Sequence, residues 1–116
     1  MNQQTFVDAL RQHVNAVAVE GVLAVLRSPP GRRPEPEVRE LSGWYLGLPA
    51  RDRERVRALL ALMGHHVLLG VLAVLDGVRA IEGPGPKGHF ELRYVSPSGE
   101  STTLVGAGAP LLHEAL

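Results

Sequence analysis

Hydrophobic positions in the first quarter of the chain recur at helical spacing. Apolar or small residues stand three or four apart, on one side of a helix, at Phe6, Leu10, Val14, Val17 and Gly21. Pro29 and Pro30 cannot continue such a helix, because proline lacks the amide hydrogen and disfavours helical backbone before it. The pattern predicts a first helix over about residues 5–27, buried along this stripe. The C-terminal end is expected to be the more buried, because further apolar residues widen the stripe there, at Val19, Val22, Leu23 and Leu26.

Two more helices are predicted downstream. Pro36 suits the first turn of a short helix over about 36–47, and Pro49 can start a long helix over about 50–78. The long helix begins with a cluster of charges that includes Arg53, and this start is expected to be a solvated surface. Its remaining part, from residue 58 to residue 75, carries no charge at all.

A helix that is apolar on every side lies either inside a protein core or in a membrane. The eighteen uncharged residues reach only the lower limit for a membrane span, and His65, His66 and two glycines make them less hydrophobic. The sequence therefore favours a central core helix, and a membrane is not an expected partner.

The hexamer Gly-Val-Leu-Ala-Val-Leu occurs twice, at 21–26 and at 70–75. Identity barely extends beyond it, so an internal duplication is not indicated. Each copy places a glycine and an alanine three apart on one helical face. Two interpretations stay open. The two helices cross at these small residues by packing ridges into grooves, or the strip of Gly70, Ala73 and Gly77 docks against a second copy of the chain.

The last third of the chain has the period of β-strands. Residues 89–95 alternate in polarity and residues 100–105 are rich in β-branched side chains, which predicts a hairpin closed by Ser-Pro-Ser-Gly. A three-residue loop with a bulge pairs Leu92 with Leu104 and Tyr94 with Thr102, and gives Gly99 a positive φ. The alternative two-residue loop would put Leu104 on the charged face of the hairpin.

The apolar face of this hairpin, formed by Phe90, Leu92 and Tyr94, is expected to cover the helices. Residues 78–82 are a candidate third strand, and a short helix is expected within residues 109–116. The fold class expected is therefore α+β, mainly α, with a single domain over residues 1–116.

Composition narrows the possible functions. Twelve basic residues balance twelve acidic ones, so no net charge draws the chain to nucleic acid. The absence of cysteine excludes disulfides and thiolate chemistry, and the start of the chain lacks the features of a secretory signal, so a cytoplasmic location is expected. Lys87 is the only lysine beside eleven arginines, a bias typical of GC-rich bacterial genomes.

Four residues of the long helix and the hairpin could line a ligand pocket between these elements: His65, His66, Asp76 and Tyr94. Adjacent helical residues point about 100° apart, so the histidine pair is poorly placed to hold one metal ion. Asp76 is interpreted more simply as an i, i+3 partner of Arg79, and more sharply as a buried general base. No phosphate-binding, dinucleotide or nucleophile motif is present, so no cofactor is expected.

The single tryptophan, Trp44, offers a different kind of site. Tyr45 shares the apolar face of its helix with Val38 and Leu41, whereas Trp44 points elsewhere. Trp44 either completes the core from another side or stands exposed as an interface anchor.

These features favour a small, non-enzymatic bacterial protein that acts by protein–protein interaction, with another protein or its own copy as the partner. Residues expected at that interface are Trp44, Gly70, Ala73 and Gly77. The size, the charge balance and the lack of a catalytic motif are similar in type to small bacterial immunity, antitoxin-like and defence-accessory proteins. The alternative is a small ligand-binding protein or enzyme, with its pocket between the long helix and the hairpin.

Overall fold

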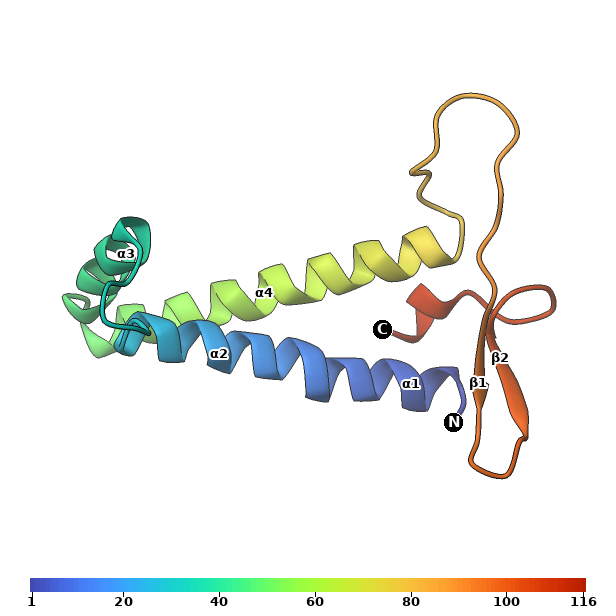
Figure 1. Ribbon diagram of the computed structural model, residues 1–116, viewed down its shortest axis with the longest axis horizontal. Helices are drawn as coiled ribbons and strands as arrows, with labels where there is room; N and C mark the ends of the chain where they lie inside the picture. The colour runs from blue at the N-terminus through green and yellow to red at the C-terminus, as the bar shows by residue number, and fades with distance from the viewer.

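Two long helical segments lie side by side and form the body of the molecule (Figure 1). The computed structural model describes residues 1–116. The first segment is α1 (Gln3–Leu10), a π-helical turn (Arg11–Asn15) and α2 (Ala16–Arg27), and the second is α4 (Ala50–Leu75). The short helix α3 (Pro36–Leu46) lies between these segments in the sequence and packs on α2 at one end of the molecule. At the other end lie the hairpin of β1 (Leu92–Val95) and β2 (Ser101–Val105) and the 3-10 turn η2 (Leu112–Ala115). The expected mainly helical α+β fold is confirmed.

The π-helical turn changes which residues of the first segment lie on its buried side. Val7 and Val19 are both buried although they stand twelve residues apart, which in an uninterrupted α-helix would separate them by about 120°. The wider turn inserts one extra residue and rotates α2 back, so that Val19, Leu23 and Leu26 continue the buried side. The predicted stripe is therefore partly buried only at its start, at Phe6 and Leu10. Val14, inside the turn, and Val17, beyond it, are half-exposed or more, and Gly21 is exposed.

One of two separate cores lies where α3 meets α2. It contains Val19, Leu23, Leu26 and Tyr45, with Leu48, Val56 and Leu60 packed against it. The buried hydroxyl of Ser42 donates a hydrogen bond of 2.6 Å to the carbonyl oxygen of Leu26, which ties the two helices together. Trp44 takes no part in this core and is 55% exposed, so of the two alternatives for this residue, core completion is wrong.

The second core joins the hairpin end to the helices. It consists of Val7, Leu68, Leu72, Val105 and Leu112, and so draws on α1, α4, β2 and η2. The side-chain amide of Gln3 reinforces it by donating to the carbonyl oxygens of Leu104 and Pro110 at 2.7 and 2.6 Å. The expected short C-terminal helix is present as η2, a single 3-10 turn.

The hairpin differs in part from the predicted register. Tyr94 pairs with Thr102 as expected, and Gly99 has a φ of 90°, which the turn requires. The predicted pairing of Leu92 with Leu104 is wrong, because a bulge between Leu92 and Arg93 moves Leu92 opposite Val105. The bulge lets two consecutive apolar residues of β2 be buried together, at Leu104 and Val105.

The hairpin is shorter than predicted and lies at the end of the helices, not over their side (Figure 1). Phe90 precedes β1 and is exposed, whereas Leu92 packs against the core that contains Val7, Leu68 and Leu72. The predicted cover of the helices by this face is therefore confirmed for Leu92 and wrong for Phe90. Residues 78–82 form no strand. Gly77, at a φ of 77°, ends α4 three residues earlier than predicted, and the amide of Val78 then donates back to the carbonyl oxygen of Ala73. The chain turns away before it could reach the edge of the hairpin.

As a result most of the surface of α4 is left uncovered. Only 22% of its most apolar 18-residue window is buried. The prediction of a central core helix is wrong, because α3 packs on α2 and the hairpin lies beyond the end of α4. The large apolar side chains of α4 that are at least half exposed are Leu59, Leu62, Met63, Val67 and Val71.

The two copies of the hexamer do not form a helix crossing. A Cβ atom added at Gly21 would meet no atom within 4 Å, and at Gly70 it would meet the guanidinium of Arg79. The glycine of α4 that faces the first segment is Gly64, where an added Cβ would lie 3.7 Å from the side chain of Asn15. The crossing at small residues of the hexamers was therefore predicted wrongly.

Candidate functional site

A pocket of about 270 Å³ lies where the end of α4 meets the hairpin. Its polar side chains are Asp76 and His89, and its walls come from the end of α4 and from within residues 105–111, which are the end of β2 and the segment after it. This is the region in which a ligand pocket was expected. Of the four residues predicted to line it, only Asp76 does so.

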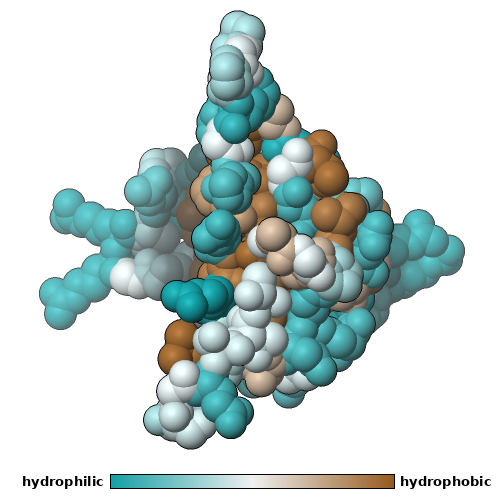
Figure 2. Space-filling model, turned by 90° about the vertical axis from the view of Figure 1, so that its right-hand side faces the viewer, coloured by the Kyte–Doolittle hydropathy of each residue, from teal (hydrophilic) through white to brown (hydrophobic).

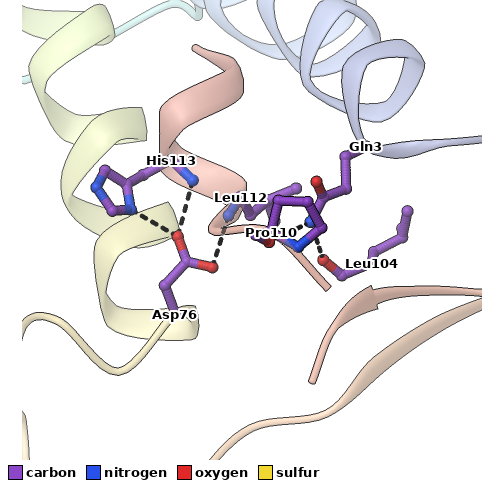
Figure 3. A network of polar contacts seen from close by, with 6 residues as sticks. All are labelled: Gln3, Asp76, Leu104, Pro110, Leu112 and His113. Carbon is purple, nitrogen blue, oxygen red and sulfur yellow. Dashed lines mark hydrogen bonds and ion pairs between the residues drawn. The ribbon is translucent and has the colours of Figure 1, made fainter. Parts of the chain in front are cut away.

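Asp76 is held by three donors from the C-terminal turn (Figure 3). Its side chain is 2% exposed and accepts hydrogen bonds of 2.8 Å from the backbone amides of Leu112 and His113. The Nδ1 atom of His113 lies 2.7 Å from the same carboxylate. The carboxylate therefore closes the N-terminus of η2 from outside, as a capping side chain would.

The pKa of Asp76 reflects these contacts. Burial by itself raises the pKa of Asp76. The hydrogen bonds from the backbone amides of His113 and Leu112 and from the ring of His113 lower it by more, so that the pKa lies below the usual aspartate value. A carboxylate with a lowered pKa and three donors on its oxygens is a weak base. The geometry of Asp76 suits an anchor for the C-terminal turn better than a general base.

The other predicted pocket residues lie elsewhere. His65 and His66 are exposed on α4, with their rings edge to face at 5.9 Å, and Tyr94 faces Thr102 in the hairpin. No three side chains of His, Asp or Glu gather as a metal site would require. His89 was missed by the sequence reasoning, because its place in the pocket depends on the path of the loop that precedes β1.

The predicted ion pair of Asp76 with Arg79 is also wrong, since Asp76 is occupied by η2. Arg79 instead folds back over α4, where its guanidinium covers Gly70 and borders a hollow of about 460 Å³ with Val67 and Val71. Gly70 and Ala73 are both buried within one chain, while Gly77 is exposed. The small-residue strip is thus already covered in part, and it is not an open docking surface.

The groove with the most apolar lining lies between the two long segments. A groove of about 330 Å³ has the apolar walls Phe6, Leu10, Val14, Val67, Leu68, Val71, Leu72 and Leu75, and its single polar residue is Asn15. Apolar side chains continue along both rims at helical spacing, with Val17 three residues after Val14 and Met63 four before Val67.

We call the set of Val14, Val17, Met63, Val67 and Val71 the open apolar face. Each of these side chains is between 50 and 65% exposed, and none is charged. Figure 2, which views the molecule from the hairpin end, shows hydrophobic residues at the surface among polar ones. The sequence held the signal for this face, because the first predicted stripe contains Val14 and Val17, but the stripe was assigned to the core.

By length and composition α4 could cross a membrane, and it is the one helix of the structure for which this holds. Comparison of the chain with known protein families, with curated proteins and with solved structures gives no match.

Proposed function

We propose that this chain is a non-enzymatic binding protein whose partner is a protein that covers the open apolar face. The observation that carries the proposal is the exposure of five apolar side chains on two adjacent helical segments, three of which, Val14, Val67 and Val71, line one apolar groove. Single exposed apolar residues are normal on soluble proteins, but a contiguous patch of this kind is typical of protein-binding surfaces.

The chemistry of the groove favours a protein partner over a small polar ligand. Nothing in its walls but Asn15 could orient a polar molecule, whereas small-molecule sites generally combine apolar walls with several placed polar groups. An amphipathic helix laid into such a groove would need no charged contact on the protein. Small bacterial immunity and antitoxin-like proteins, which act by covering another protein, remain the class of function we propose.

The pocket beside Asp76 gives no comparable support for catalysis. Its carboxylate is already engaged by Leu112 and His113, and the remaining titratable side chain, His89, lies 3.2 Å from the exposed carboxylate of Glu91. We therefore do not propose an enzyme.

The test is affinity capture from the native host with two matched variants. Val67→Glu places a charge on the open apolar face, and Leu62→Glu places the same charge at an equally exposed position, 55% against 57%, on another side of α4. We expect Leu62→Glu to retain a captured protein that Val67→Glu loses. Capture that is the same for both variants would contradict a partner at this face.

A further inference from the structure

We propose that the partner on the open apolar face is a second copy of this chain, so that two helical pairs complete a single core between them. This inference rests on the proposed function and names the occupant of the same face. Its first support is the surface area of the single chain. A compact monomer of 12.5 kDa has an accessible surface of about 6,200 Å², whereas this chain exposes 8304 Å².

The difference, about 2,100 Å², exceeds the roughly 800 Å² that each partner buries in an interface of standard size. The protruding loop and hairpin account for part of this excess surface. Even if half of the excess belongs to them, about 1,000 Å² remains, which is enough for one side of a stable dimer interface. The radius of gyration agrees, at 18.7 Å against about 13 Å for a compact chain of this length.

The distribution of the core gives the second support. Thirteen of 116 residues are buried, and nine of them form two hydrophobic clusters, one at each end of the helical pair. The middle of the pair, where Asn15 lies against Gly64, has no buried hydrophobic cluster of its own. The open apolar face lies beside this middle region, which is where a second copy would supply the missing layer.

The charge pattern favours a like partner. The five residues of the face are uncharged, so two copies can meet there without bringing like charges together. On α4 the apolar positions Val56, Leu60, Met63, Val67, Val71 and Val74 follow one another at intervals of three or four, as in helices that pack along their length. A twofold axis that lies in the interface and perpendicular to α4 would make the two α4 helices antiparallel. Their helix dipoles would then point in opposite directions, which is favourable.

A lipid surface is the competing occupant, because α4 is apolar enough to enter a membrane. Two features favour the second copy. The first segment, which supplies Val14 and Val17, carries Arg11 and Glu20 close to them, so a membrane would have to accept charged neighbours of the face. The open apolar face also spans two helical segments, so that the same pair of segments in a second copy can pack against it.

The experiment measures the molar mass of the purified full chain by light scattering from about 1 to 100 µM, with Val67→Glu, Val71→Glu and Leu62→Glu beside it. We expect a mass of two chains for the wild type and for Leu62→Glu. We expect one chain for Val67→Glu and Val71→Glu, each with the helical circular dichroism of the wild type. The two face variants are independent, so the test stands if one of them does not fold.

A wild type that remains one chain at the highest concentration would overturn the dimer. So would loss of the dimer in Leu62→Glu to the same degree as in the face variants. Sedimentation with phosphatidylcholine vesicles separates the competing occupant, since a monomer that sediments with vesicles would assign the face to lipid. A monomer that still captures a host protein through Val67 would overturn only the second copy and leave the proposed function intact.

Discussion

The buried carboxylate of Asp76, at the end of α4, lies 2.7 Å from Nδ1 of His113 and joins residues 37 apart in sequence. The same carboxylate accepts the backbone amides of Leu112 and His113, so the C-terminal turn is tied to α4 by three polar contacts at one side chain. Leu112, fully buried, then contributes to the core at the hairpin end. The position of Leu112 in the core therefore depends on the hydrogen bonds of Asp76.

Asp76→Asn tests this dependence. The amide group keeps the size of the carboxylate but removes its charge, and it turns a donor toward amides that need an acceptor. We expect the free energy of unfolding to fall by about 2 kcal/mol, the scale for hydrogen bonds to a buried charged group. Amide exchange of residues 112–116 should accelerate.

Asp8→Asn is the control, because the carboxylate of Asp8 is exposed and pairs only with neighbours on its own helix. It should change the free energy of unfolding by less than about 0.5 kcal/mol. Equal effects of the two substitutions in denaturant titrations would show that the C-terminal turn is held by packing alone.

The lowered pKa of Asp76 predicts a specific loss of stability in acid. A carboxyl group whose pKa is lower in the folded than in the unfolded chain stabilises the fold fully above its unfolded pKa, about 3.9 for aspartate. That contribution falls as the pH drops from this value through the folded-state pKa. The difference in unfolding free energy between wild type and Asp76→Asn should therefore be constant above about pH 5 and shrink below pH 4. A difference that is independent of pH down to 2 would contradict the lowered pKa.

Much of the secondary structure could be predicted from the sequence, because its signals are local. Pro36 and Pro49 mark the starts of α3 and α4, and the Ser-Pro-Ser-Gly turn fixes Gly99 and the pairing of Tyr94 with Thr102. What could not be predicted is which side of each helix is covered. The π-helical turn rotates the buried side of the first segment, and periodicity assumes a constant rotation per residue.

The candidate sites were less predictable for a related reason. The partners of Asp76 come from the far end of the chain, so the neighbouring Arg79 was the only candidate that local spacing could offer. The apolar character of α4 was visible in the sequence, but the pattern does not distinguish burial within one chain from burial against a partner. The positions of α3 and the hairpin decide that, and they are set by tertiary packing.

Arg53 was predicted to lie on a solvated surface, and its contacts revise that expectation. Its guanidinium donates to the carbonyl oxygens of Leu48 and Leu46 at 3.1 and 2.7 Å and lies 5.6 Å from the ring centre of Tyr45. Carbonyl groups at the end of a helix have no partner within it, so Arg53 caps the end of α3.

We expect Arg53→Ala to lower the free energy of unfolding by about 1 kcal/mol, the net value of a typical hydrogen bond. Arg55→Ala is the matched control, two residues along the same helix, exposed and without a hydrogen bond or ion pair. It should have an effect below about 0.5 kcal/mol. Thermal unfolding of the two variants side by side measures the difference, and indistinguishable transitions would show that the contacts of Arg53 contribute no stability.

The two glycines of the repeated hexamer should respond differently to alanine. At Gly21 a new Cβ would meet no atom within 4 Å, in the middle of an α-helix. Gly21→Ala should therefore raise the free energy of unfolding by about 0.5–1 kcal/mol, because alanine loses less backbone entropy than glycine when the helix forms.

At Gly70 the new Cβ would stand 2.6 Å from Nη1 of Arg79. The guanidinium is the end of a flexible side chain and can move aside, so Gly70→Ala should fold normally but gain less than Gly21→Ala. Denaturant titrations give both values. If the two glycines were instead the contact points of crossing helices, both substitutions would lower the stability, and that result would restore the packing first predicted from the repeat.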